Sequence, residues 1–296
     1  MQTHFLVLIT GFDFSTNTGV LWGNETRLPI PGSRSLSYAR RWDHSGYVVD
    51  ENYGGSSLFR LDKDLVVRDA VMEPACRGAV FIERIESSVL IPCFGSDNVW
   101  VVDDRFVTDR IVPTCHRPHG IYAYRNKIYV PCRGDRDDGE IRIYDAGLAA
   151  STSIRVPTGP RHMIFVEDDF YVVTEFGHEV LWFSESHALL GRVDLEPDED
   201  ARGVTGAEIR YAASRAWILV SLRHESHHGW LIVLDHALNE LHRVEVGTNP
   251  RFFDLCGDSV LVLNQDDRTA TTISLDTLET DTSEDLGMCP QSFCAI

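Results

Sequence analysis

The chain has 296 residues and a formal net charge of −18, and 43% of its residues are hydrophobic and 10% aromatic. This apolar fraction is enough for a large folded core and argues against disorder. The negative charge opposes nonspecific binding to nucleic acid and to anionic membranes, so we expect neither as a partner.

The first nine residues predict a strand and not a targeting segment. They contain no basic region and only five consecutive apolar residues, and no run in the chain approaches the 18 needed to cross a bilayer. Seven cysteines, an odd number without Cys-x-x-Cys spacing, favour reduced thiols in a cytoplasmic protein over a disulfide framework. Cys93 and Cys132 are interpreted as small buried residues and not as nucleophiles.

Short apolar runs separated by turn-sized polar gaps predict β-strands along the whole chain. The first three, at 5–11, 19–25 and 26–30, are one strand short of a four-stranded sheet. Complete sets of four begin at 36, 79, 119, 161, 207 and 251. The set from 161 to 195 is the clearest, with runs at 163–166, 170–174, 180–183 and 192–195. We expect no helix of note and no linker, so residues 1–296 are read as a single domain.

These sets repeat every 40 to 46 residues, which is the length of a four-stranded propeller blade. The predicted fold is therefore all-β, a seven-bladed β-propeller of antiparallel blades. The last apolar run, 289–296, has the size of the strand missing from the first blade. We expect this C-terminal strand to join the N-terminal strands and close the ring, which removes exposed sheet edges.

In such a ring the innermost strand of each blade begins, and the second strand ends, at the same face. Side chains at these two kinds of position, here called rim positions, converge on one central opening. Five arginines, a histidine and a carboxylate at one opening predict a site for a small anionic molecule, since arginine holds carboxylate and phosphate groups bidentately. The first-strand positions are Arg77, His119, Arg161 and Arg251, with His162 beside them, and the second-strand positions are Asn52, Arg133, Glu175, Arg223 and Asn264.

An alternative reading applies to each of these residues. An arginine at the rim can pair with a carboxylate of the neighbouring blade and only tie the ring together, and Glu175 can be such a partner of Arg161. His119 can be a loop histidine. A histidine-rich loop at 223–229, with His224, His227 and His228, lacks further ligands at fixed spacing and is read as a solvated loop. We therefore expect no metal and no other cofactor.

Several linked motifs resemble those of the seven-bladed lactonase family, which groups propeller-type 6-phosphogluconolactonases with fungal carboxymuconate cyclases (3-carboxy-cis,cis-muconate lactonizing enzymes). They are Gly159-Pro160-Arg161-His162 with Thr174-Glu175 after it, Arg117-Pro118-His119-Gly120, Gly206-Ala207-Glu208 leading to Leu222-Arg223, and Asn249-Pro250-Arg251 leading to Asn264-Gln265. The resemblance spans all blades. It implies that the family's rim histidine is His119, its arginines Arg161, Arg223 and Arg251, and its glutamate Glu175.

The chain departs from the family at two places. It has Ala75-Cys76-Arg77-Gly78 where the family usually has Pro-x-His, and Pro131-Cys132-Arg133-Gly134 where the family often has an aspartate, as in Pro-Asp-Leu-Gly. Three functions are open at this point. The first is hydrolysis of a phosphorylated or carboxylated lactone. His119 would be the general base, and Glu175 would orient His119 or an arginine. Arg161, Arg223 or Arg251 would hold the anion, and one of them the developing oxyanion.

The second function is cycloisomerisation of a dicarboxylate by the same residues, and the third is a propeller without catalysis that serves as a binding scaffold. Arg77, Arg133, His162 and Asn264 are expected to contribute to binding beside Arg251. Possible protein partners and the oligomeric state are not predicted.

Overall fold

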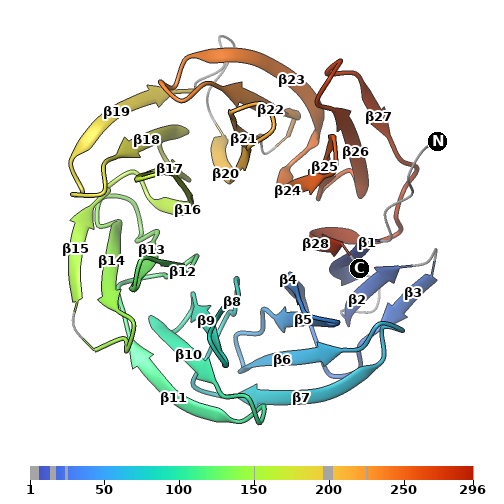
Figure 1. Ribbon diagram of the computed structural model, residues 1–296. Helices are drawn as coiled ribbons and strands as arrows, with labels where there is room; N and C mark the ends of the chain where they lie inside the picture. The colour runs from blue at the N-terminus through green and yellow to red at the C-terminus, as the bar shows by residue number, and fades with distance from the viewer. Residues whose placement is uncertain are drawn as a thin grey trace.

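A computed structural model describes residues 7–13, 18–23, 26–149, 151–195, 203–224 and 226–295. These residues form 28 strands in seven four-stranded antiparallel sheets arranged as a ring around a central opening (Figure 1). The predicted seven-bladed propeller is confirmed. Among the described residues there is no helix that is long and apolar enough to cross a membrane.

Each blade runs from the central opening to the outside of the ring. The first complete blade has β4 (Leu36–Trp42), β5 (Ser45–Asp50), β6 (Ser56–Leu61) and β7 (Val67–Glu73). The next two have β8 (Glu83–Ile85), β9 (Ser88–Cys93), β10 (Asn98–Val102) and β11 (Thr108–Pro113), then β12 (Tyr122–Tyr124), β13 (Lys127–Cys132), β14 (Glu140–Asp145) and β15 (Ser151–Arg155).

The following three blades keep the same order. They are β16 (Pro160–Val166), β17 (Asp169–Thr174), β18 (Glu179–Phe183) and β19 (Leu189–Asp194); β20 (Val204–Ala212), β21 (Trp217–His224), β22 (His228–Leu234) and β23 (Glu240–Thr248); and β24 (Pro250–Cys256), β25 (Ser259–Asn264), β26 (Thr269–Ser274) and β27 (Thr280–Thr282). The inner strand expected at 79–83 is shorter and lies later in the chain, as β8 at Glu83–Ile85. Before it and before β12, the chain keeps only the isolated bridges Ala79–Cys93 and Pro118–Cys132.

The seventh blade joins the two ends of the chain. Its sheet has the order β28 (Cys289–Ala295), β1 (Val7–Asp13), β2 (Thr18–Gly23) and β3 (Thr26–Pro29), so the C-terminal strand is the innermost one. The register runs from Val7 opposite Ala295 to Thr10 opposite Ser292. The buried Thr10 hydroxyl lies 2.9 Å from the Ser292 hydroxyl. The expected closure is present, although residues 5–6 of the predicted first strand, 24–25 of the second and 296 of the last lie outside the described part.

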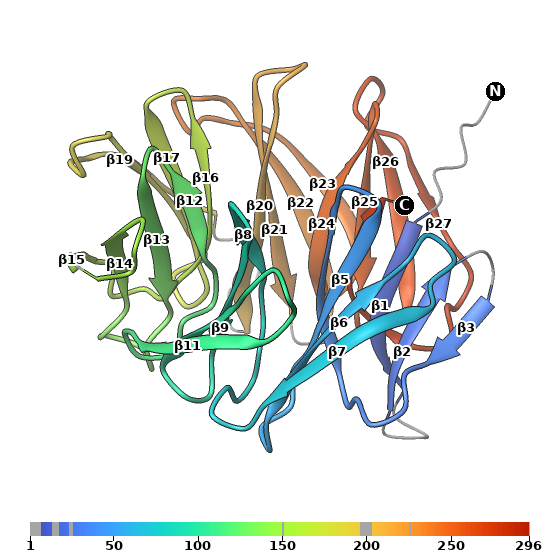
Figure 2. The same cartoon turned by 60° about the horizontal axis from the view of Figure 1, so that its bottom comes forward.

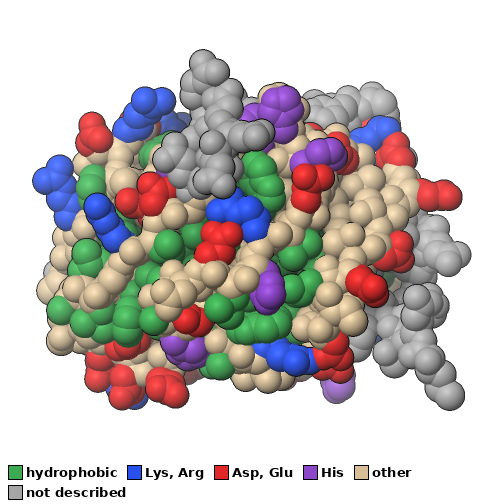
Figure 3. All heavy atoms as spheres, turned by 90° about the horizontal axis from the view of Figure 1, so that it is seen from above, with side chains coloured by type: hydrophobic (Ala, Val, Ile, Leu, Met, Phe, Trp, Pro, Cys, Tyr) green, Lys and Arg blue, Asp and Glu red, His purple; other side chains and the backbone are tan. Residues whose placement is uncertain are grey.

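The core lies between neighbouring blades, because each sheet is apolar on both faces. One cluster, for example, combines Tyr171 and Val173 of β17 with Ile209 of β20 and Ile218 and Val220 of β21. On the side of the molecule that Figure 3 shows, charged side chains of both signs are interspersed with apolar ones. In the tilted view inner strands such as β16 and β21 are steep, whereas outer strands such as β7 and β11 lie much flatter, so each blade is twisted (Figure 2).

Two disulfides correct the expectation of reduced thiols. Cys76 is bonded to Cys93 and Cys115 to Cys132, and only Cys256, Cys289 and Cys294 are free. Each bond joins the segment before an inner strand to the end of the second strand of the same blade. Cys93 and Cys132 are buried but are not simply small core residues. Because disulfides persist in oxidising compartments, the cysteine content no longer favours a cytosolic location.

The signal for these bonds was present in the sequence. Both pairs are 17 residues apart, and the second pair lies at the same place in its blade as the first. An odd total count does not exclude pairing when the paired cysteines recur with the structural repeat.

Removing residues 292–296 should destabilise the protein strongly. The deletion takes away most of the inner strand of the closing blade, and with it the greater part of the ladder to β1 and the apolar burial of Phe293. We expect the melting temperature to fall by more than 10 °C or the chain not to fold, measured by differential scanning calorimetry. A truncated chain that melts within a few degrees of the full one would contradict closure by this strand.

Candidate active site

The first kind of rim position follows a tight turn at the start of four inner strands. Each turn begins with a residue of positive φ. An alanine or proline follows it, and the rim residue comes next. The turn residues are Gly78, Arg117, Gly159 and Asn249, with φ between 54° and 78°. The rim residues two positions later are Val80, His119, Arg161 and Arg251. The shared turn therefore fixes which side chain of each blade faces the central opening.

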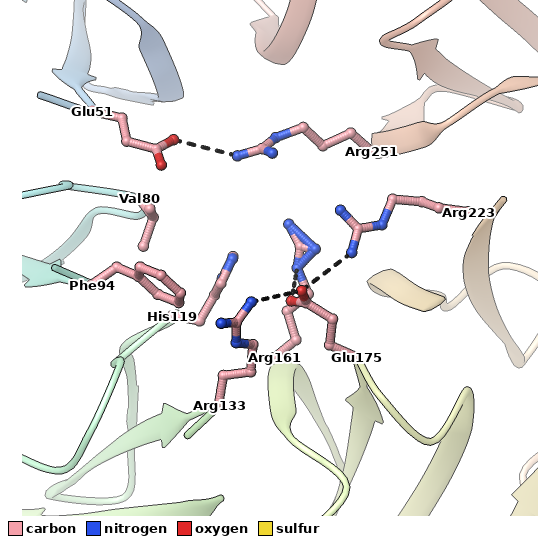
Figure 4. Close-up of a pocket in the computed structure, with 9 residues that line it drawn as sticks. All are labelled: Glu51, Val80, Phe94, His119, Arg133, Arg161, Glu175, Arg223 and Arg251. Atoms are coloured by element: carbon pink, nitrogen blue, oxygen red, sulfur yellow. Dashed lines mark hydrogen bonds and ion pairs between the residues drawn. The ribbon is translucent and has the colours of Figure 1, made fainter. Parts of the chain in front are cut away.

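The second kind of rim position lies at the end of the second strand of a blade, one residue after a residue that pairs with the start of the inner strand. Asp50, Cys93, Cys132, Thr174 and Leu222 each pair with the inner strand at this corner. The next residues are Glu51, Phe94, Arg133, Glu175 and Arg223. Together with the four residues of the first kind they line one cavity of about 140 Å³ (Figure 4). Such a volume suits a small metabolite and not a polymer.

Glu175 is the centre of the charged side of this cavity. Its carboxylate accepts a hydrogen bond from Arg133 Nη1 at 2.9 Å and lies 3.6 Å from both Arg161 Nε and Arg223 Nη2. Burial raises the pKa of Glu175, but the attraction of Arg161, Arg223 and Arg133 outweighs it and brings the pKa to about 2. Glu175 is therefore a carboxylate at neutral pH and orients arginines, not His119.

Arg161 carries more hydrogen-bonding capacity than its neighbours use. It is 3% exposed, and its Nε and Nη1 atoms make no hydrogen bond to the described residues. Burial and the nearby Arg223 lower the pKa of Arg161 to about 9, so it is still charged at pH 7. A buried guanidinium with unused donors needs water or an anion to complete its shell, and an anion also compensates its charge. Its surroundings thus favour a ligand with a carboxylate or phosphate group.

Aromatic rings hold Arg133 in place. Its guanidinium carbon lies 4.7 Å from the ring centre of Phe94 and 4.9 Å from that of Phe176, so it is stacked between the two rings. Phe94 and Val80 form an apolar wall on the side of the cavity away from Arg223 (Figure 4). The cavity can therefore hold the carbon skeleton of a ligand against this wall and its anionic group against the arginines.

His119 lies beside the arginines and is buried, with only 7% of its surface exposed. Its ring centre is 5.8 Å from that of Phe94, in an edge contact, and 5.0 Å from that of His162. Burial lowers the pKa of His119 well below its ordinary value, and the positive charges of Arg161 and Arg251 lower it further. The imidazole is consequently neutral at pH 7 and able to accept a proton.

Glu51 is a cavity residue that the sequence analysis missed. Its carboxylate lies 3.5 Å from Arg251 Nη2, and it faces the cavity from the wall opposite Glu175 (Figure 4). Burial raises its pKa, against the opposing effect of Arg251. The sequence favoured Asn52 instead: the strand end at Asp50 is as predicted, but the rim position was taken one residue too far along the chain. A shift of one residue in a strand moves the side chain to the other face of the sheet.

The structure brings six of the ten predicted rim residues together and places the other four, Asn52 among them, outside the cavity. Arg77 is exposed on the rim, and Val80 takes its place in the cavity. Val80 lies 39 residues before His119. The two cysteines of its blade lie the same 39 residues before the two of the next blade. Asn264 is buried inside its blade and donates to the Thr269 and Thr271 hydroxyls. His162 lies under the cavity. The six that line it are His119, Arg133, Arg161, Glu175, Arg223 and Arg251.

The histidine-rich loop has a structural role at one residue. His224 is buried, and its Nδ1 accepts hydrogen bonds from the backbone N–H groups of Ser226 and His227. Within the described part of the chain, no group of three or more His, Cys, Asp or Glu side chains is arranged to hold a metal ion.

Comparison with known families decides which proteins this arrangement belongs to. The family described as lactonase, 7-bladed β-propeller, matches residues 120–286, more than half of the chain. The chain belongs to this lactonase family. It is accordingly an enzyme of the lactonase type, and the matched region contains five of the nine cavity residues.

Solved structures share the whole ring of this lactonase. The periplasmic gluconolactonase of Pseudomonas aeruginosa is 17% identical, with a TM-score of 0.78 over 98% of both chains. A candidate 6-phosphogluconolactonase of Bacteroides fragilis is 15% identical, with a TM-score of 0.76 over 100% of this chain and 99% of its own. A Lactobacillus plantarum protein is 15% identical, with a TM-score of 0.80 over 99% of both. Such identities establish the fold. A comparison with curated proteins finds no match.

Inorganic phosphate should stabilise the lactonase through Arg161. A bound anion raises the melting temperature by mass action, by about 2–4 °C for each kcal/mol in a protein of this size class. Arg161→Lys should abolish most of this rise, because a point charge replaces the planar fork. Arg77→Lys is the matched control and should keep it, since Arg77 lies outside the cavity. An equal rise in all three proteins would place anion binding elsewhere.

Proposed function

We propose that the protein hydrolyses a small lactone that carries a phosphate or carboxylate group. The observation that carries this proposal is the buried Arg161, which has unused donors in a cavity shared with a neutral His119. Membership of the lactonase family supports hydrolysis of a lactone, and the cavity supports the anionic substituent. The description of one similar structure as a candidate 6-phosphogluconolactonase agrees with a phosphorylated sugar lactone.

The chemistry follows from the two sides of the cavity. His119 accepts a proton from a water molecule as that water attacks the lactone carbonyl carbon. Negative charge then develops on the carbonyl oxygen, and an arginine of the Glu175 cluster stabilises it. The remaining arginines hold the anionic substituent. When the ring C–O bond breaks, protonated His119 returns its proton to the leaving oxygen, so the enzyme is regenerated with no net proton uptake by the site.

The cavity favours this reaction over the two alternatives. A carboxymuconate-type cycloisomerase must hold several carboxylates, but here Glu175 and Glu51 already neutralise part of the arginine charge, and Glu51 would repel a carboxylate at Arg251. A scaffold without a ligand would bury the charge of Arg161 beside that of Arg223 and gain no binding from it.

Replacing His119 by asparagine should separate catalysis from binding. We expect kcat on an accepted anionic lactone to fall by about 10²–10⁴-fold, the usual contribution of general-base assistance. The rise in melting temperature with phosphate should remain, because the arginines are unchanged. His116→Asn, in an exposed histidine three residues earlier, is the control and should keep normal turnover. Near-normal turnover of His119→Asn would show that the base is another group.

The acid limb of the pH–rate profile should lie below the ordinary histidine pKa. His119 must be neutral to accept a proton, and burial and the neighbouring arginines lower its folded-state pKa. Activity should therefore persist as pH falls through about 6.5, where an unperturbed histidine would become protonated. The profile of kcat/KM against pH reports this value for the free enzyme. A limb centred at or above 6.5 would contradict the assignment.

A further inference from the structure

A second polar chamber lies directly under the cavity and shares His119, Arg161 and Arg251 with it. It has a volume of about 10 Å³, which is the space that one water molecule requires. Its other polar side chains are Ser37, Tyr38, His162, Glu208 and Gln291. A polar chamber of this size suits one bound water, because several groups around it can exchange hydrogen bonds.

The chamber adjoins a buried histidine–carboxylate pair. His162 and Glu208 are 3% and 1% exposed, and His162 Nδ1 lies 3.0 Å from Glu208 Oε1. Arg210 Nη1 donates to the same oxygen at 2.6 Å, and the backbone N–H of Ile209 does so at 3.0 Å. Burial raises the pKa of Glu208, but Arg210 and His162 outweigh this and lower it to about 2. The Tyr122 hydroxyl also lies 3.2 Å from His162 Nδ1, and a hydroxyl can accept from the same N–H. Glu208 is a carboxylate that can only accept, so it fixes the proton of His162 on Nδ1.

The direction of the remaining hydrogen bonds follows from this proton. Burial lowers the pKa of His162 to about 4, against the opposing effect of Glu208, so the ring is neutral at pH 7. With Nδ1 protonated, Nε2 of His162 can only accept a hydrogen bond. Nδ1 of His119 is buried and makes no hydrogen bond to the described residues. A water in the chamber can accept from His119 Nδ1 and donate to His162 Nε2.

We propose that Glu208 and His162 are positioning residues that set the tautomer of His119 through one water in this chamber. His119 then carries its proton on Nδ1 and presents Nε2 to the substrate cavity as the proton acceptor. Glu208 touches neither the substrate nor the reacting water, and it acts through His162. The same chain stabilises the imidazolium that forms when Nε2 takes a proton, because each ring donates toward the carboxylate. The stabilisation of the imidazolium rests on the proposed hydrolysis, whereas the tautomer of His119 does not depend on it.

The tautomer can be measured directly by NMR on the protein labelled with ¹⁵N-histidine. Long-range ¹H–¹⁵N couplings distinguish the two neutral tautomers, and the spectrum of His119→Asn identifies the His119 signals. We expect the Nδ1–H tautomer for His119 in the wild-type protein at pH 7. Observation of the Nε2–H tautomer would overturn the proposal, whether or not the protein hydrolyses lactones.

A pair of variants tests the role of Glu208. Glu208→Gln should lower kcat by about 10–100-fold with KM nearly unchanged, as is typical when a supporting residue behind a reactive group is lost, and His119 should become a mixture of tautomers. Asp254→Asn is the matched control, since Asp254 also pairs with Arg210, at 3.3 Å, but does not contact His162. It should keep both the His119 tautomer and kcat.

Equal losses in the two variants would indicate a structural role for Glu208 and overturn its positioning role. If Glu208→Gln does not fold, the wild-type tautomer still decides the question. An inactive wild-type protein with the predicted tautomer would contradict the proposed hydrolysis but not the hydrogen-bond chain.

Discussion

The attraction between one buried carboxylate and three arginines organises the centre of this protein. Arg133, Arg161 and Arg223 come from three blades and would repel one another without Glu175. Removing one partner from a buried ionic cluster typically costs about 3–5 kcal/mol, because the remaining charges are left uncompensated. A single carboxylate cannot neutralise three guanidinium groups. The cluster keeps a surplus of positive charge facing the cavity, in a chain whose overall charge is −18.

The ring makes this arrangement possible because each blade supplies two fixed corners to the same opening. The sheets pack through buried apolar faces, and β28 closes the circle, so the corners cannot drift apart. Two disulfides add a covalent link at the corners that carry Val80 and Phe94 and, in the next blade, His119 and Arg133. Side chains held in this way are preorganised, which lowers the cost of binding and of stabilising charge in a transition state.

The sequence could predict the blades because a strand needs only local pattern, and 40–46 residues of such pattern recur along the chain. It also brought His119, Arg161, Glu175, Arg223 and Arg251 to one opening, since Pro-x turns and strand ends mark those corners. It failed where one residue of register decides the outcome. Glu51 was missed in favour of Asn52, and Asn264 points into its blade, because neighbouring strand residues face opposite sides. Arg77 was selected because the repeated turn around Gly78 has no proline to mark it.

The central claim is that the cavity binds a lactone through its anionic group, and one comparison of rates tests it most directly. Hydrolysis of 6-phosphogluconolactone and of unphosphorylated gluconolactone can both be followed by proton release with a pH indicator. We expect kcat/KM to be about 10–100-fold higher for the phosphorylated lactone, since a charge-assisted hydrogen bond contributes about 1.5–3 kcal/mol. Equal kcat/KM values for the two lactones would contradict anion recognition. A protein that hydrolyses neither of them and no carboxylated lactone would contradict it as well.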